Sequence, residues 1–192
     1  MIRMQNLRKQ DIQAIGAHVA QAFLAEPGCF QPLSLKDATT LFTLVVETCY
    51  EAGHLYTISP RQEGYLVYWT KKERPGMLIQ LQLGWKMMTR LPLKVGMVLK
   101  DGQSCWKPTE KRYKHNEDFV EVFLIAVRKE YQGQGHFRKM LEEPFTLAKE
   151  RDTICVLDTD SITKAEKYCH EGMHIVDRKV QKSGIEMFAL EK

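Results

Sequence analysis

An apolar run followed by two closely spaced glycines constrains this chain more than any other stretch. Residues 119–127, FVEVFLIAV, are apolar except for Glu121 and rich in β-branched and aromatic side chains, which predicts a buried strand. A polar turn and the tetrapeptide QGQG at 132–135 follow, and a helix is expected from about residue 136. Glycines let the backbone approach a ligand, and a helix start offers unpaired N–H groups, so this order suits a phosphate. A tight turn with no ligand fits the same residues.

The spacing of this turn resembles the acyl-CoA motif of the GNAT superfamily of N-acetyltransferases, Q/R-x-x-G-x-G/A. Here Gln132 follows Val127 after four residues and opens Gln132-x-x-Gly135. Phe137 takes the place of the last Gly or Ala of the motif. It still supplies a backbone N–H group, and its ring can turn inward to the sheet.

Further resemblances concern the branch of the superfamily. Glu121, two residues after Phe119, is placed like the general base of the histone-acetyltransferase branch. Pro144 within the expected helix 136–150 and the run Leu157-Asp158-Thr159 in the next strand are similar to puromycin-acetyltransferase-like proteins. Those proteins also insert a helical segment before the apolar strand.

The resemblance implies an α/β protein with the GNAT (acyl-CoA N-acyltransferase) fold, a mixed central sheet of about seven strands flanked by about four helices. Residues 1–192 would form a single GNAT acetyltransferase domain with a helical insertion at about 77–118. The implied activity is transfer of an acetyl group from acetyl-CoA, as cosubstrate, to a primary amine of a small molecule or peptide. A non-catalytic acyl-CoA-binding or regulatory GNAT module is the alternative.

Roles for individual residues also follow from the resemblance. Tyr168, four residues before Gly172, matches the superfamily's YxxxGF ending, in which the tyrosine protonates the leaving thiolate. Glu121 would take the amine proton, directly or through a water, and the amine would attack the thioester directly. Lys164 stands where an asparagine often contacts the pantetheine arm.

The resemblance also implies that the thioester lies where the strands at 119–127 and 154–158 splay. Backbone N–H groups there would hold the pantetheine arm and polarise the carbonyl, and those of the glycine turn would cradle the pyrophosphate. The expected cofactor contacts are Ile125, Ala126, Val127, Gln132, Gly133, Gln134, Gly135, His136 and Phe137.

Glu121 is informative on chemical grounds alone. A carboxylate inside an apolar strand is costly unless it faces solvent, finds a partner or has a raised pKa. Strict alternation would place Glu121 on one face with Phe123, Ile125 and Val127, and the residues between them on the other. Both a general base and an edge-exposed glutamate remain open.

Composition limits the partners and the compartment. A net charge of +4 suits an anionic cofactor but is far from that of a dedicated nucleic-acid binder. No apolar run approaches the ~18 residues that span a membrane. The first residues, MIRMQNLRKQD, show no apolar h-region, so we do not expect secretion. Five scattered cysteines are typical of reduced thiols in a cytoplasmic protein. We therefore expect neither nucleic acid nor membrane as a partner, and either a monomer or a homodimer.

Periodicity orders the remaining elements. Residues 1–7 predict a short strand, and Asp11 is a plausible N-cap for a helix through Ile12, Ile15 and Val19. A second helix is expected at 35–52 and paired strands at 54–59 and 64–70. After the helix 136–150, the pattern predicts a strand at 153–158, a helix at 161–170 and strands at 175–180 and 185–190.

The segment 77–118 predicts two short helices split at Pro92. Three interpretations compete: a packed helical insertion, a lid or wall over the acceptor site, and a membrane-surface or dimer patch. After the helices, basic residues either attract CoA phosphates or belong to a solvated loop; they are Lys107, Lys111, Arg112 and Lys114.

Residues 170–174, HEGMH, match the H-E-x-x-H pattern of zinc proteases. Zinc would need both histidines on one helix face and a third ligand. Gly172 followed by a β-branched run indicates a helix end, so the two histidines should diverge. We expect no metal site.

Overall fold

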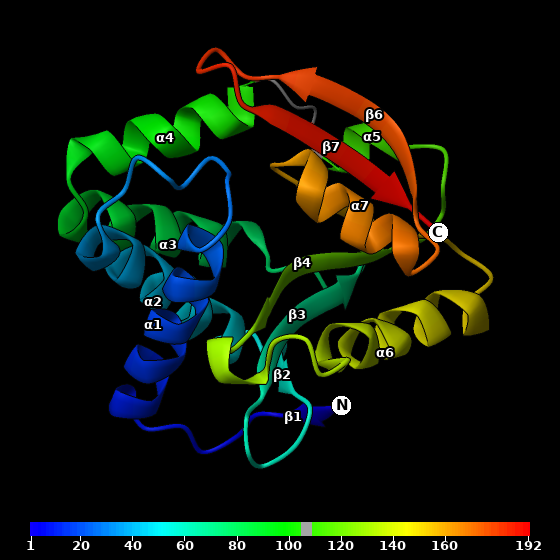
Figure 1. Ribbon diagram of the computed structural model, residues 1–192, viewed down its shortest axis with the longest axis horizontal. Helices are drawn as coiled ribbons and strands as arrows, with labels where there is room; N and C mark the ends of the chain where they lie inside the picture. The colour runs from blue at the N-terminus through cyan, green and yellow to red at the C-terminus, as the bar shows by residue number, and fades with distance from the viewer. Residues whose placement is uncertain (105–108) are drawn as a thin grey trace.

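The computed structural model describes residues 1–104 and 109–192, which form a seven-stranded sheet in the order β1-β2-β3-β4-β5-β7-β6 (Figure 1). The strands are β1 (Ile2–Arg3), β2 (Leu55–Thr57), β3 (Gly64–Thr70), β4 (Val120–Val127), β5 (Cys155–Thr159), β6 (His174–Val180) and β7 (Glu186–Glu191). The helices are α1 (Lys9–Leu24), α2 (Leu35–Glu51), α3 (Met77–Arg90), α4 (Leu93–Ser104), α5 (Thr109–Arg112), α6 (His136–Glu150) and α7 (Ile162–His170), with a 3₁₀ turn η1 (Lys129–Tyr131). Neighbouring strands are antiparallel except β4 and β5, which are parallel.

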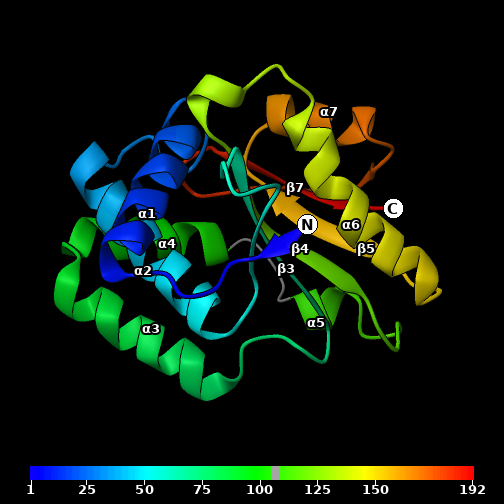
Figure 2. The same ribbon diagram turned by 90° about the horizontal axis from the view of Figure 1, so that it is seen from below.

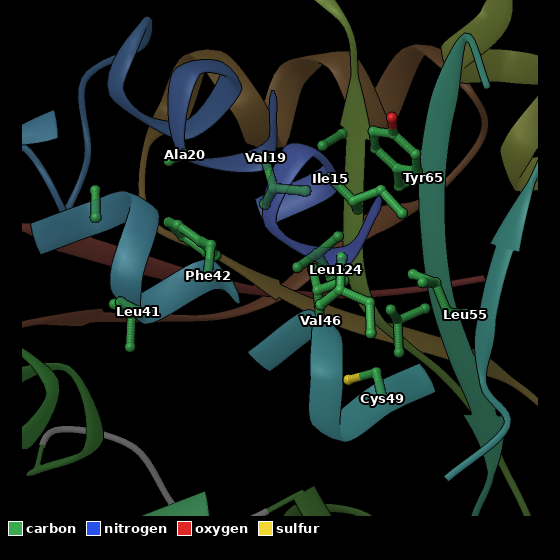
Figure 3. Packing of buried hydrophobic residues seen from close by; sticks show 14 of the residues in the cluster. Ile15, Val19, Ala20, Leu41, Phe42, Val46, Cys49, Leu55, Tyr65 and Leu124 are labelled. Atoms are coloured by element: carbon green, nitrogen blue, oxygen red, sulfur yellow. The ribbon is translucent and has the colours of Figure 1, made fainter. Parts of the chain in front are cut away.

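Helices cover both faces of the sheet because β3 and β4 are apolar on both faces (Figure 2). One cluster joins α1 and α2 to the face of β3 that carries Tyr65, Val67 and Trp69 (Figure 3). A second cluster joins α6 and α7 to the opposite face, through Leu66 and Tyr68. We call these the α1–α2 face and the α6–α7 face.

A β-bulge interrupts β4. Val67 pairs with Leu124 but the next residue, Tyr68, pairs with Val122, so Phe123 has no partner opposite it. The extra residue shifts the alternation by one position. The expected strict alternation is therefore wrong: Glu121 contacts Trp69 on the α1–α2 face, whereas Ile125 and Val127 pack on the α6–α7 face.

β4 and β5 separate soon after they meet. Their paired residues are Val120 with Cys155 and Glu121 with Val156. Beyond that point β5 continues along β7, while β4 continues along β3. The expected splay between these two strands is confirmed.

The two expected helices of the insertion are α3 and α4, which meet at Pro92, and the short helix α5 follows them within the described part of the insertion. Val95 of α4 is fully buried against the cluster of the α1–α2 face, so the insertion is packed on the domain. Lys107 lies outside the described residues. None of the described helices is long and apolar enough to cross a bilayer.

Two local expectations are wrong. Helix α1 begins at Lys9 with Arg8 as its N-cap, and Asp11 is its third residue, whose carboxylate accepts from the Arg8 N–H group at 2.9 Å. The first strand is confined to Ile2–Arg3, and Asn6 adopts a left-handed conformation that ends the extended backbone.

The close approach of α1 and α2 depends on Gly16. A Cβ atom there would lie 2.6 Å from the Thr43 Cα atom. We expect Gly16→Ala to lower the free energy of unfolding by about 1 to 3 kcal/mol, because the helices must move apart. Gly84→Ala in α3 is the matched control: its Cβ would meet nothing within 4 Å, and it should stabilise by about 0.5 to 1 kcal/mol. Urea unfolding measures both, and a neutral Gly16→Ala contradicts this account.

Candidate functional site

The splay leaves one edge of β4 without a strand partner. Near its end, the Arg128 N–H group donates to the Glu63 carbonyl at 3.0 Å. Alternation along an antiparallel ladder then directs the N–H groups of Leu124 and Ala126 toward β3, and those of Ile125 and Val127 toward the open side. At the closed end, the Val120 N–H group donates to the Ile154 carbonyl of the segment leading into β5. β4 therefore presents two outward N–H groups where β5 has turned away.

The turn after β4 leads directly to an uncapped helix start. Gly135 is the N-cap of α6 and supplies no side chain, and the first turn of α6 carries no acidic residue. Gly133 and Gly135 have φ angles of 74° and 79°, which favour glycine, and a Cβ at either would meet nothing within 4 Å. Such a helix start can bind an anion.

The two glutamines of this turn are engaged within it. The Gln132 amide donates to the Val127 carbonyl at 3.2 Å, which points to the open side of β4. The Gln134 amide donates to the Glu130 carbonyl at 3.0 Å. These bonds fix the shape of the turn and leave the N–H groups at the start of α6 uncapped by either side chain.

Phe137 turns inward, as expected. Its ring packs on the α6–α7 cluster with its centroid 5.1 Å from that of Tyr168. Tyr168 is buried on α7, and burial, followed by the nearby Asp160 and Glu26 carboxylates, raises the pKa of its hydroxyl well above its ordinary value. The hydroxyl consequently stays protonated at neutral pH and can act only as a proton donor there.

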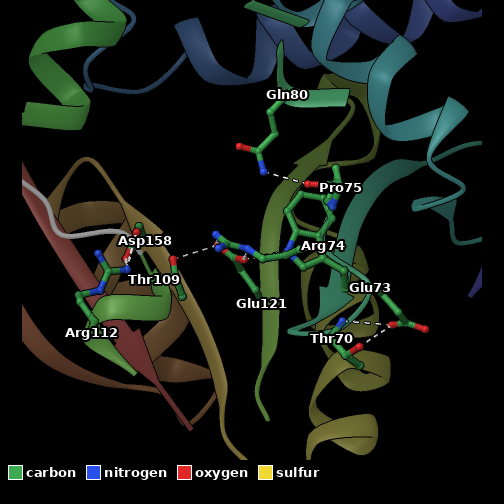
Figure 4. Close-up of polar contacts among 10 residues, drawn as sticks. Thr70, Glu73, Arg74, Pro75, Gln80, Thr109, Arg112, Glu121 and Asp158 are labelled. Atoms are coloured by element: carbon green, nitrogen blue, oxygen red, sulfur yellow. Dashed lines mark hydrogen bonds and ion pairs between the residues drawn. The ribbon is translucent and has the colours of Figure 1, made fainter. Parts of the chain in front are cut away.

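Glu121 is buried and paired (Figure 4). Its carboxylate accepts from the Trp69 indole N–H group at 2.7 Å, from Arg74 Nε at 2.7 Å and from the Thr109 hydroxyl at 3.2 Å. The alternative of an edge-exposed glutamate is wrong, because partners rather than solvent satisfy the charge. Its role as general base stays a prediction.

A second carboxylate lies on the same face. Glu121 pairs with Val156, and Asp158 lies two residues further along β5, where β4 has already diverged. Two oxygens of Asp158 accept from Arg112 at 2.6 and 2.7 Å. Its side chain is 30% exposed, yet protein surrounds it closely enough that burial, opposed by Arg112, raises its pKa to about 6. Asp158 is thus a solvent-reachable carboxylate that changes protonation near neutral pH.

Lys164 takes part in a link between α7 and the α1–α2 loop. Its ammonium lies 2.7 Å from one Asp160 oxygen, and the other oxygen accepts from the Cys29 N–H group at 2.8 Å. The same ammonium lies 5.4 Å from the centre of the Phe23 ring. Its expected contact with a pantetheine arm stays a prediction, and these contacts would have to persist or rearrange around it.

The expected residues fall into three groups. Glu121 lies on the α1–α2 face, Tyr168 and Phe137 lie together on the α6–α7 face, and the turn from Gln132 lies at the end of β4 between them. Asp158 and Arg74 were not among the candidate site residues predicted from the sequence, and Arg112 was expected to attract CoA phosphates or to lie in a solvated loop rather than to pair with Asp158. A lone acid in the apolar strand CVLDT was the available signal for Asp158.

Other features of the described chain lie away from the splay. Two surface hollows have volumes of about 260 and 420 Å³ and are lined by Met1 with Lys139, and by Arg3 with Tyr50, respectively. Of the H-E-x-x-H residues, His170 ends α7 and His174 begins β6, so the expected helix end is confirmed.

Comparison with solved structures decides the fold. An N-acetyltransferase from Staphylococcus aureus superposes with a TM-score of 0.60 at 14% identity, covering 98% of each chain. The chain has the GNAT fold. An arylalkylamine N-acetyltransferase 2 from Aedes aegypti gives 0.56 at 10% identity, covering 98% of this chain and 96% of that one. An agmatine N-acetyltransferase gives 0.53 at 11%, covering 99% and 98%. No protein-family model and no curated protein matches the sequence.

The Glu121 network makes a prediction about stability. Glu121→Gln removes the charge that Arg74 pairs with, and Arg74 is only 23% exposed, so we expect a loss of about 1 to 3 kcal/mol in the free energy of unfolding. Glu166→Gln on the exposed surface of α7 is the control and should stay within about 0.5 kcal/mol. A Glu121 variant as stable as this control would show that the network does not support the fold.

Proposed function

We propose that this protein is an acetyl-CoA-dependent N-acetyltransferase that acetylates a primary amine by direct attack. The observation that carries the proposal is the open side of β4, which runs into the uncapped start of α6. The GNAT fold of the chain, shared with solved N-acetyltransferases, supports it. The placement in a puromycin-acetyltransferase-like branch stays a prediction.

The residues of the splay fit the donor. The N–H groups of Gly133 to Phe137 offer donors for a pyrophosphate, and open space above Gly133 and Gly135 lets it approach. The Gln132 N–H group, also expected in this cradle, donates to the Lys129 carbonyl at 3.4 Å. The N–H groups of Ile125 and Val127 would bind the pantetheine arm and the thioester carbonyl. Acetyl-CoA, when bound, supplies the acyl group as a reactive thioester.

Asp158 is the better placed of two candidate bases. Each Glu121 oxygen accepts two hydrogen bonds, one from Arg74 and one from either Trp69 or Thr109, and these occupy the positions that a proton would need. Arg112 donates to both Asp158 oxygens, one bond to each. Asp158 is reachable from solvent, and its pKa of about 6 suits proton removal from an ammonium near neutral pH. Asp158 would receive the amine proton, and Glu121 would position Trp69, Arg74 and Thr109 through its hydrogen bonds.

Tyr168 would protonate the CoA thiolate from the other face. Leu157 and Asp158 point to opposite sides of β5, and Leu157 shares the α6–α7 cluster with Tyr168. The acid and the base would therefore lie on opposite sides of the splay, so that the amine arrives from one side and the thiol leaves on the other. The names of two similar structures, an arylalkylamine and an agmatine N-acetyltransferase, support an amine acceptor.

A non-catalytic acyl-CoA-binding module is the second candidate. The Lys164 ammonium contacts Asp160 and the Phe23 ring, so it already has partners within this chain. Phe137 stands where the motif has a small residue. Such a module would bind acetyl-CoA without releasing free thiol in the presence of amines.

The pH dependence of turnover tests the enzyme and its base together. Release of free thiol from acetyl-CoA is measured with a panel of primary amines from pH 5 to 9. We expect kcat/KM to rise with pH through about 6, because Asp158 must lose its proton, and the midpoint should not move between amines of different pKa. Tyr168 should cause no alkaline fall below pH 9, because its pKa is raised.

Matched variants show which carboxylate causes the rise of kcat/KM near pH 6. Asp158→Asn should lower kcat by about 10²- to 10⁴-fold and abolish the rise near pH 6. Glu121→Gln should keep that rise, at a temperature where it remains folded. If Glu121→Gln abolishes the rise near pH 6 and Asp158→Asn keeps it, the base is Glu121. Binding of acetyl-CoA with no turnover for any amine would favour the second candidate.

A further inference from the structure

Helix α3 exposes an apolar stripe. Five of its large apolar side chains are between 63 and 77% exposed: Met77, Leu78, Leu81, Trp85 and Met88. At 3.6 residues per turn they fall within an arc of about 100°, which is the width of a face made for burial. Large exposed apolar patches mark surfaces that meet a partner.

The opposite face of α3 is already held by the domain. The Lys86 ammonium lies 3.0 Å from a Glu47 oxygen of α2, and Met87 and Leu91 pack against the α1–α2 cluster. In Figure 2, α3 lies along the outer margin of the molecule. These contacts with α2 and the α1–α2 cluster orient α3 so that its apolar stripe points away from the domain.

Helix α4 repeats this arrangement. Val95 is fully buried in the domain, whereas Leu93 and Met97 are 89 and 66% exposed. Lys94 and Lys100 are exposed on the same helix. Both helices of the insertion thus combine an anchored side with an uncovered apolar side.

The charge of this segment selects among possible occupants. Helices α3 and α4 contain four cations (Lys86, Arg90, Lys94, Lys100) and one acidic residue, Asp101 near the end of α4. Lys86 pairs with Glu47 and Lys94 with Asp37, both on α2, so the exposed Arg90 and Lys100 are the cations that remain for a partner. A second copy placed on the same face would offer these cations no carboxylate of α3 to pair with, so it would gain no charge complementarity there. Anionic lipid headgroups complement these charges, and a Trp- and Leu-bearing helix with cations and no carboxylates has the composition of interfacial helices.

We propose that α3 and α4 dock this protein onto the surface of an anionic lipid bilayer, with the apolar stripe of α3 in the headgroup region. The expectation that no membrane takes part would then be wrong for the surface, although no described helix crosses a bilayer. This docking is independent of the acyl transfer proposed above. The docking helix is nevertheless adjacent in the chain to the site, because Arg74, which binds Glu121, lies three residues before α3.

Vesicle flotation of the full chain tests the proposal. We expect binding to vesicles of phosphatidylcholine mixed with phosphatidylglycerol, and binding weaker by about tenfold or more to phosphatidylcholine alone. The double variant Leu81→Ser, Trp85→Ser should lose about tenfold or more in vesicle affinity, because both side chains leave the stripe. Arg90→Gln with Lys100→Gln should weaken binding to the anionic vesicles.

Matched controls remove similar groups elsewhere. Ile175→Ser with Val176→Ser takes two exposed apolar side chains from β6, and Lys36→Gln takes an exposed cation from α2; both should bind as the unaltered chain does. Circular dichroism checks that each variant is folded. The proposal is overturned if the chain does not bind the anionic vesicles, or if it binds both kinds of vesicle equally. A dimer by light scattering that the Leu81, Trp85 variant abolishes would do so too, and would assign the stripe to a second copy.

Discussion

The pairing of β4 with two different neighbours governs the rest of this structure. Buried backbone groups must be bonded, and β4 pairs from Val120 to Val127 only on the side of β3, with one interruption at the Phe123 bulge. On its other side β5 pairs at Val120 and Glu121 and then follows β7. The bulge at Phe123 follows this short pairing. The side chains and N–H groups of β4 therefore change sides close to the point where β5 diverges from it. Outward N–H groups and a helix start meet there.

The acidic groups of the α1–α2 face show how the insertion is joined to this site. Glu121 and Asp158 are carboxylates in adjacent strands, and each is paired with an arginine. Arg74 precedes α3 and Arg112 ends α5, so the two cations reach the sheet from the two ends of the inserted segment. Buried ion pairs add little net stability compared with apolar packing, but removal of one partner is costly. The inserted helices are therefore coupled to the strands at the splay through charges.

Sequence patterns identified the elements better than the site. The apolar run, the glycine turn and the helix after it follow from local chemistry, and the seven-stranded GNAT fold that they implied is confirmed. A bulge adds one residue and leaves no compositional mark, so the facing of Glu121 relative to Ile125 was not predictable. The pairs that join Arg74 to Glu121 and Arg112 to Asp158 span 47 and 46 residues, and no local pattern encodes them. The Arg8 cap of α1 was missed because Asp11 is the better N-cap type.

Hydrogen exchange of the β4 amides tests the central claim, that the open side of this strand binds the acyl donor. NMR would follow the four consecutive amides from Leu124 to Val127 with and without acetyl-CoA. Leu124 and Ala126 point to β3 and should exchange at the same slow rate in both samples, which makes them internal controls. The account predicts that Ile125 and Val127 exchange faster in the free chain and become protected when acetyl-CoA is added. Unchanged exchange at Ile125 and Val127 under saturating acetyl-CoA, or equal protection of all four amides, would contradict it.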